Sequence, residues 1–438
     1  MSLKKNLLIV FVFCNLSLSA QWEWWEELSP MPEPVTNNAV TNATVNGVPF
    51  IYSFSGLDES KECGKNHLRS FRYDTSSNEW ETIDDLPDSK GGKVAAGAST
   101  VKNKIYIIGG YHISNSCGEI SSRKVNIYDP ETNSYLSDGA DIPIAIDDHV
   151  QAVYRDSLIF VITGWSNTTN VVDVQIYNPN LDEWTKGTSV PNDPEWRVFG
   201  ASGSIVGDTI YFLGGAKYTC ATNACFEPSR IFRKGYINPN DPTDIIWSSF
   251  DAPLAMGYRM GAFVYGEIPF WFGGSELTYN FDGIDYNGSG GVSPLSRLLS
   301  YNGENLKELD DNSYPAIMDL RGVAQIDETS FVVAGGMLAD QVVSDRTVRI
   351  NLNVLLDSNE DVEVPNIKIY PNPTDDFLRI ESPDANLIEL YSISGDLLYS
   401  EEIIRNSTMD VSNFTSGVYL LSVTKKSGIQ DTRKIIIK

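Results

Sequence analysis

Residues 105–110, Ile-Tyr-Ile-Ile-Gly-Gly, decide the fold because versions of this stretch occur six times along the chain. Each version is a short β-rich run that ends in glycine. The closing glycines lie at positions 56, 110, 164, 215, 274 and 336, which are 51 to 62 residues apart. A period of this size predicts an array of small sheets, one for each repeat.

Each repeat carries the signals of four strands. A turn such as Asn46-Gly47 or Gly207-Asp208 separates the glycine run from an earlier strand, as in a two-residue hairpin. A third strand ends in Tyr and a turn, as at 128–130 and 177–179, and a fourth strand carries an aromatic residue such as Trp184. Four antiparallel strands make one propeller blade, so six repeats predict six blades.

The paired glycines, the Tyr-Asp/Asn-Pro turns and the following Trp resemble those of the Kelch family of β-propellers. Gly-Gly pairs occur in repeats two, four, five and six, whereas repeats one and three have Ser55-Gly56 and Thr163-Gly164. The resemblance implies an all-β fold, with a six-bladed Kelch-type β-propeller over residues 21–356 that is followed by a small C-terminal β-sandwich.

The N-terminal end of the array predicts how the ring closes. Repeat six has no fourth-strand Trp, whereas Trp25 is followed seven residues later by Pro32. Trp80 with Pro87 and Trp184 with Pro191 have the same spacing. We therefore expect residues 22–28 to supply the fourth strand of blade six, which leaves no open sheet edge.

Residues 1–20 have the pattern of a signal peptide. Lys4 and Lys5 form a charged start, residues 7–13 are apolar, and Ala20 offers a cleavage point before Gln21. The apolar stretch is too short to span a bilayer. The sequence thus predicts an exported protein without a transmembrane segment.

The last part of the chain has a different character. Residues 357–364 read as an acidic linker, and residues 365–438 contain short alternating strands that suit a small β-sandwich. Its motifs resemble the C-terminal sorting domain of the type IX (Por) secretion system of Bacteroidetes. The residues that carry this resemblance are Pro371, Asn372, Pro373, Gly395, Gly417 and Tyr419. The resemblance implies export through the periplasm, contact with the outer-membrane secretion machinery, and a secreted or cell-surface location. It leaves open whether the tail is removed.

Four cysteines follow the signal peptide, an even number in an oxidising setting. Cys63 and Cys117 each lie seven residues past the closing glycine of their repeat. Equivalent loops of neighbouring blades would bring them together, so we expect a Cys63–Cys117 disulfide. Cys220 and Cys225 lie in one loop and could staple it. Free thiols and other pairings stay open.

The charge balance argues against nucleic acid as a partner. The chain has 58 acidic and 33 basic residues, which gives a formal net charge of −25. Binding to a phosphate backbone needs a basic face. We therefore expect no nucleic-acid partner, and the acidity itself indicates mainly solubility.

Long loops mark the expected functional face. The connections between the second and third strands are long in four repeats, at residues 57–69, 111–122, 216–230 and 275–296. We call the side of the ring that carries these connections the long-loop face, and elaborated loops on a rigid scaffold often bind ligands. The inner strands enter from the same face. Candidate residues at the mouth of the central channel are Lys93, Asp148, His149, Arg197, Arg259 and Arg321.

Arginines from three successive blades could grip a carboxylate by charge-assisted hydrogen bonds, which would suit an acidic sugar. The alternative is structural, because a chain this acidic offers arginines many partners. A basic residue at this place is also common in Kelch sequences.

No metal or other cofactor is expected. The three histidines, His67, His112 and His149, lie on the long-loop face, but their blades spread radially and no ligand spacing links them. The copper chemistry of galactose oxidase, a Kelch-type enzyme, requires a free cysteine and implies seven blades, so it does not fit.

Two functions follow from the resemblance. The leading hypothesis is an exported or cell-surface module that binds a glycan or a protein. The alternative is a cofactor-independent epimerase or mutarotase of the sialate type, in which Asp148, His149 and an arginine would supply acid and base near the anomeric centre. The sequence leaves open whether the propeller is catalytic.

Overall fold

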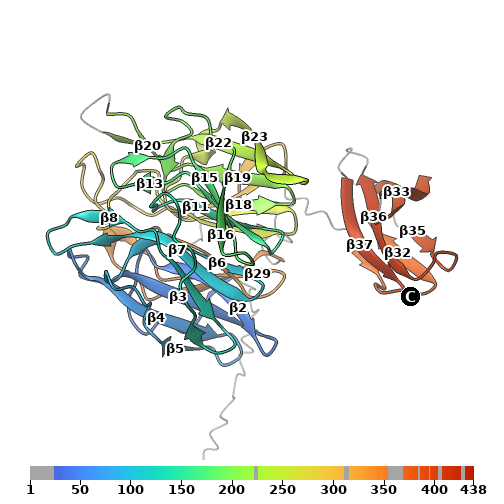
Figure 1. Cartoon of the computed structure of the whole chain (residues 1–438), viewed down its shortest axis with the longest axis horizontal. Coiled ribbons are helices and arrows are strands. Elements are labelled where there is room, and N and C mark those ends of the chain that lie inside the picture. Colours follow the sequence, from blue (N-terminus) through green and yellow to red (C-terminus); the bar gives the residue numbers. More distant parts are fainter. Residues whose placement is uncertain are drawn as a thin grey trace, which may run out of the picture.

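The structure is a computed structural model of the chain, and strands dominate it (Figure 1). It describes residues 24–220, 225–309, 315–353, 368–382, 385–393, 395–402, 407–425 and 430–438. The predicted signal peptide at 1–20 and linker at 357–364 lie outside the described residues. Six blade sheets precede residue 354 and two further sheets follow residue 367, which confirms the predicted all-β architecture.

Blade three shows how one repeat folds. Its antiparallel strands are, from the inside outwards, β11 (Val150–Tyr154), β12 (Leu158–Ile162), β15 (Val174–Asn178) and β16 (Glu183–Gly187). Alternate residues of β12 enter two different cores. Phe160 packs with residues of blade four, and Ile159 packs with residues of blade two. The glycine runs read as continuous apolar stretches because neighbouring blades cover both of their faces.

The other blades repeat this order. Blade one consists of β2 (Ala39–Val45), β3 (Val48–Leu57), β4 (Asn66–Asp74) and β5 (Glu79–Ile83). Blade two consists of β6 (Val94–Val101), β7 (Lys104–Ile113), β9 (Val125–Asp129) and β10 (Ser134–Tyr135), with β8 (Glu119–Ser121) beside β7. Blade four consists of β18 (Ser202–Val206), β19 (Thr209–Leu213), β22 (Ile231–Asn238) and β23 (Asp241–Asp251). Blade five consists of β24 (Gly261–Tyr265), β25 (Ile268–Phe272), β26 (Leu298–Tyr301) and β27 (Leu306–Glu308).

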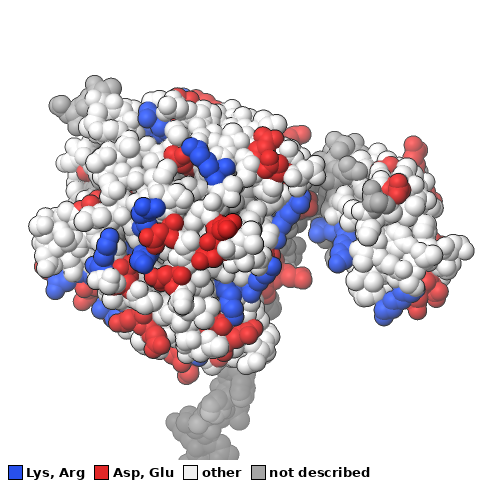
Figure 2. Space-filling model, in the orientation of Figure 1, with Lys and Arg blue, Asp and Glu red and all other residues white. Residues whose placement is uncertain are grey.

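Small elements decorate the connections. On the long-loop face, β13 (Trp165–Ser166) pairs with β14 (Thr169–Asn170), and β17 (Val198–Phe199), β20 (Ala216–Tyr218) and β21 (Phe226–Pro228) form a three-stranded sheet. Short 3₁₀ turns occur at η1 (Pro253–Ala255) and η2 (Ala339–Gln341). On the propeller face in Figure 2, acidic and basic side chains are interspersed. Among the described residues, no helix has the length and apolar character needed to cross a bilayer.

Blade six is completed by the N-terminal segment. Its chain order is β28 (Ala324–Gln325), β29 (Ser330–Ala334) and β30 (Thr347–Asn351), and β1 (Trp25–Glu27) pairs antiparallel with β30. Glu26 forms an ion pair with Arg349 at 2.7 Å. Trp24 is buried in the core between blades five and six. The pairing confirms the prediction that a segment within residues 22–28 supplies the fourth strand.

The glycine pairs satisfy a steric demand. Gly109 has a φ of +66°, and a Cβ there would lie 2.4 Å from the carbonyl oxygen of Ile146 in the next blade. Blades one and three put Ser55 and Thr163 at the equivalent place, also with positive φ. Their hydroxyls donate across the blade boundary, from Thr163 to the carbonyl of Val198 at 2.9 Å and from Ser55 to that of Lys93 at 2.8 Å. In these two blades a side-chain hydrogen bond thus accompanies the backbone hydrogen bond that the following glycine, Gly56 or Gly164, donates to the same carbonyl.

Residues after 367 form a β-sandwich of their own. One sheet contains β31 (Lys368–Tyr370), β32 (Phe377–Glu381) and β35 (Ser407–Asp410). The other contains β34 (Leu397–Glu402), β33 (Ala385–Ser392), β36 (Gly417–Lys425) and β37 (Gln430–Ile437). Apolar side chains such as Leu378, Leu390 and Ile435 fill the core between them.

The motif residues of this tail have structural tasks. Asn372, between Pro371 and Pro373, exchanges two hydrogen bonds of 2.9 Å with the backbone of the last strand. Tyr419 is buried, and its hydroxyl donates to the carbonyl of Thr415 at 2.6 Å. Gly395 has a φ of +89° in the turn after β33, and Gly417 begins β36.

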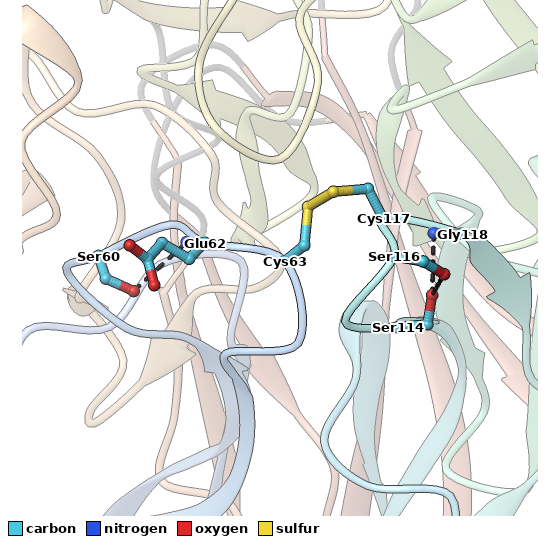
Figure 3. The surroundings of a disulfide bond; sticks show 7 residues. All are labelled: Ser60, Glu62, Cys63, Ser114, Ser116, Cys117 and Gly118. Atoms are coloured by element: carbon cyan, nitrogen blue, oxygen red, sulfur yellow. Dashed lines mark hydrogen bonds between the residues drawn. A yellow bond between two sulfur atoms is a disulfide. The ribbon is translucent and has the colours of Figure 1, made fainter.

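Both expected disulfides are present. Cys63 and Cys117 join the long loops of blades one and two, with Cα atoms 5.0 Å apart (Figure 3). Cys220 and Cys225 are joined within the long loop of blade four. The covalent links therefore lie on the long-loop face, where they restrain three of its loops in two places.

Candidate functional site

One residue of left-handed backbone lies just before or at the start of the inner strand of every blade. These residues, with φ between +47° and +66°, are Asn37, Ala95, Asp148, Gly200, Arg259 and Asp319. The N–H of each of the four residues from Ala95 to Arg259 donates to the carbonyl of its predecessor in the series, over distances of 2.7 to 3.4 Å. The inner ends of the blades are therefore stitched together by backbone hydrogen bonds. At the closure, the hydroxyl of Thr36 donates to Asp319 at 2.6 Å.

Arg259 braces this ring across the channel. Its Nε and Nη2 donate to the two carboxylate oxygens of Asp148 at 2.9 and 2.6 Å, and its Nη1 donates to Asp319 at 2.8 Å. The guanidinium is fully buried, and its Cζ lies 5.1 and 5.4 Å from the ring centroids of Tyr258 and Tyr279. Burial acts to lower the pKa of Arg259, but the Asp148 carboxylate and further neighbours outweigh it and hold that pKa well above its usual value. Arg259 is thus committed to the architecture.

The three candidate arginines do not converge on one binding site. Arg321 donates to the carbonyl of His149 at 2.9 Å and lies 3.5 Å from Asp148. Arg197 precedes β17, and within the described part of the chain its side chain has no ion pair or hydrogen bond. Arg259 and Arg321 converge on Asp148, whereas Arg197 joins neither of them.

His149 and Arg321 line the central channel. A cavity of about 120 Å³ lies among the inner strands of all six blades. The His149 ring is 2.9 Å from the Gln151 side chain. Burial and the positive charge of Arg321 lower the pKa of His149 to about 4, so its imidazole is neutral at physiological pH.

Lys93 belongs to a separate buried cluster between blades one and two. It donates to Asn126 at 2.8 Å and lies 3.8 Å from Asp88, which is also 3.7 Å from His112. Burial lowers the pKa of Lys93 to about 8. The described residues contain no group of three or more His, Cys, Asp or Glu side chains arranged for a metal ion.

A second cavity, of about 160 Å³, opens on the long-loop face. Loops and strand ends of blades two to five supply its lining. We call it the loop-face pocket, and its lining residues are Tyr111, Glu119, Asp147, Asp148, Trp165, Asn167, Phe199, Phe226, Asn280 and Tyr286. Asp148 is the one sequence candidate among them.

One wall of the loop-face pocket is aromatic. Trp165 lies 5.5 Å from both Phe199 and Phe226, measured between ring centroids. Tyr286 lies 4.6 Å from Phe226. These rings come from three blades and hold one another in edge-to-face and tilted contacts, which gives the wall a defined shape.

The other wall is acidic. Asp147 and Trp165 exchange two backbone hydrogen bonds of 2.9 Å, which place the carboxyl beside the aromatic wall. The hydroxyl of Ser121 donates to Asp147 Oδ2 at 2.5 Å. Burial, reinforced by Asp148, raises the pKa of Asp147 well above its usual value. Burial also raises the pKa of Glu119, which lies at the rim.

Sequence reasoning missed most of this pocket. Two signals were available: Trp165 directly follows the closing Gly164 of repeat three, and Asp147 directly precedes the candidate Asp148. The proximity of Glu119, Phe226 and Tyr286 depends on how four blades are arranged, and no local pattern in the sequence encodes that.

Comparison with known families agrees with this architecture. Residues 5–215 match the KLHDC2/KLHL20/DRC7 Kelch-repeats domain, and residues 368–438 match the Secretion system C-terminal sorting domain. The chain therefore contains a Kelch-repeat region and a C-terminal sorting domain. The tail indicates export through the secretion system that reads such domains.

Related proteins match only parts of this chain. Beta-scruin of Limulus polyphemus is 29% identical over 173 residues, which are 38% of this chain and 18% of beta-scruin. Kelch-like protein terF of Aspergillus terreus is 26% identical over 254 residues, 56% of this chain and 50% of terF. Beta-agarase D of Zobellia galactanivorans is 31% identical over 71 residues, 16% of this chain and 15% of the agarase. The chain thus spans half or less of each relative.

A solved structure has the same fold. The structure of YjhT superposes with a TM-score of 0.57 over 73% of this chain and 95% of YjhT, at 14% sequence identity. At this identity the likeness concerns the fold alone.

Proposed function

We propose that this protein is an exported or cell-surface binding module, and that the loop-face pocket holds its ligand. The carrying observation is the pocket itself, whose lining combines aromatic side chains with the buried carboxyl groups of Asp147 and Asp148. Ligand sites combine apolar walls with a few placed polar groups in this way. The covalently restrained loops around it give such a site a rigid frame.

A glycan is the ligand that the pocket suits best. Sugar rings have an apolar face that stacks on aromatic side chains, and hydroxyls that bond to carboxyl and amide groups. Both kinds of partner are present in the lining, since Trp165 and Phe226 supply aromatic rings, and Asp147 and Asn280 supply a carboxyl and an amide group. Pockets for drug-sized ligands have volumes of about 300 to 1,000 Å³. A cavity of about 160 Å³ therefore suits one sugar unit.

The alternative, an epimerase or mutarotase that acts on an acidic sugar, has less support. No Lys or Arg is among the residues that line the loop-face pocket. Arg259 already donates to Asp148 and Asp319. His149 and Arg321 line the channel instead, and His149 is already bonded to Gln151. A pocket with acidic walls repels a carboxylate ligand.

The sorting tail completes the proposal. We infer that a signal peptide at residues 1–20 directs the chain to the periplasm. The secretion machinery of the outer membrane then reads residues 365–438 and delivers the propeller to the cell surface or the medium.

A glycan array probed with the full chain tests the binding function. We expect binding to a defined set of sugars, reduced about 30-fold or more in Trp165→Ala, as for a binding hot spot. The matched control is Trp184→Ala, because Trp184 is also half-buried in blade three but packs on Tyr177 in β15, away from the loop-face pocket. Equal binding by both variants and the wild type would refute the proposed site.

A further inference from the structure

Asp147 and Glu119 differ in one respect from Asp148, the third carboxyl group that lines the loop-face pocket: within the described part of the chain, neither forms an ion pair. Asp147 is 3% exposed, and Ser121 occupies only its Oδ2 atom. Its Oδ1 receives no hydrogen bond or ion pair from any residue that the structure describes. This almost fully buried residue thus lines the pocket with one carboxyl oxygen that has no partner among the described residues.

The surroundings of Asp147 favour a positively charged group. Aromatic faces attract cations, and the pocket offers Trp165, Phe226 and Tyr286 opposite its carboxyls. Glu119 at the rim adds a second acid without a basic neighbour in the lining. Burial of acids without a counter-ion is costly, and a bound cation would relieve that cost.

From this geometry we infer that the loop-face pocket recognises an ammonium group, and that the sugar unit it takes is an amino sugar in its protonated form. This inference rests on the proposed glycan-binding function. The ammonium group would donate to Asp147 Oδ1 and lie close to Glu119, while the sugar ring stacks on the aromatic wall. Hydroxyls of the sugar would reach the amides of Asn167 and Asn280, which line the same cavity.

The test compares glucosamine with glucose, which has a neutral hydroxyl in place of the ammonium group. Both are titrated into the full chain by calorimetry at a pH where the amine is protonated. We expect glucosamine to bind at least about tenfold more tightly than glucose, because a desolvated cation–aromatic and cation–carboxylate site is worth more than about 1.4 kcal/mol. Equal affinities, or tighter binding of glucose, would overturn the inference.

Two variants assign the effect to the carboxyls. Asp147→Asn keeps an acceptor for Ser121 but removes the negative charge. Glu119→Gln removes the negative charge of an exposed residue at the rim, where the substitution should not disturb folding. Each should reduce the preference for glucosamine over glucose by about tenfold. The control is Asp208→Asn, a carboxylate on the opposite face that pairs with Arg155. A preference that survives both pocket variants would also overturn the inference.

A further pair of probes separates the source of the amine. A short peptide with one lysine is compared with the same peptide carrying norleucine, which lacks the ammonium group. Preferential binding of the lysine peptide, with no response to glucosamine, would overturn the amino-sugar assignment in favour of a protein amine. Binding of neutral glycans alone on the array, lost in Trp165→Ala, would overturn the cation inference but leave the proposed binding function intact.

Discussion

Asp147 and Asp148 are neighbours in sequence, and both are almost fully buried, yet they lie in opposite electrostatic settings. Asp148 receives two hydrogen bonds from Arg259 and has Arg321 nearby. Asp147 receives one hydrogen bond from a serine and forms no ion pair with any described residue. The comparison shows how one acidic pair can serve both tasks: the partnered carboxylate holds the ring together, and the unpartnered one is available to a ligand.

The largest loss of stability should follow from removing Arg259, the ion-pair partner of Asp148. Arg259→Leu removes the cation that Asp148 and Asp319 share and leaves Asp319 buried without its ion-pair partner, which should lower the free energy of unfolding by about 3 to 5 kcal/mol. Urea unfolding monitored by tryptophan fluorescence measures it, because all 9 tryptophans precede residue 272 and report on the propeller. Arg230→Leu, which removes an exposed ion pair with Asp251, should cost less than about 1 kcal/mol. Equal losses of stability in the two variants would contradict the structural role of Arg259.

Acid should have the next largest effect, through a buried base at the same end of the channel. The pKa of His149 is lowered to about 4 from its ordinary 6.5, so between these values the unfolded chain binds more protons than the folded one. Stability should therefore fall by about 3 kcal/mol as the pH drops through this window. His149→Asn should lose less stability than the wild type over the same window, in unfolding curves recorded at successive pH values. His67 has the same shift and continues to contribute in the variant. Identical pH profiles would show that His149 does not carry the effect.

The smallest expected change in stability distinguishes Asp147 from Asp148 most directly. Asp148→Asn should destabilise the propeller by about 1 to 3 kcal/mol, because it weakens a charged, buried hydrogen-bond pair. At high pH, Asp147→Asn should instead stabilise the propeller. The raised pKa of Asp147 means that the folded protein loses stability as pH rises through that pKa, and the variant avoids this loss. The gain should disappear in acid. Thermal unfolding of both variants across pH checks the pair, and the same sign for both at high pH would refute the division of roles.

Much of the scaffold was predictable because the repeats encode it locally. Glycine runs, turns and the N-terminal Trp25 indicated six blades and their closure, and equivalent loop positions indicated the Cys63–Cys117 link. The left-handed ring was partly visible, since Asn37, Asp148 and Gly200 are residue types that adopt positive φ readily. Ala95 and Arg259 gave no such signal.

The site was less predictable because its chemistry depends on pairing. The sequence put Arg259 and Asp148 near the channel mouth, but it could not show that each satisfies the other. The cation-free acids and aromatic rings of the loop-face pocket come from four blades, so their meeting is a property of the folded ring.

A crystal structure of the protein with glucosamine tests the central claim most directly. The account predicts the sugar in the loop-face pocket, with its ammonium nitrogen about 2.8 Å from Asp147 Oδ1 and its ring against Trp165 or Phe226. A sugar whose amine points to solvent, or one bound in the channel beside Arg321 and His149, would contradict it.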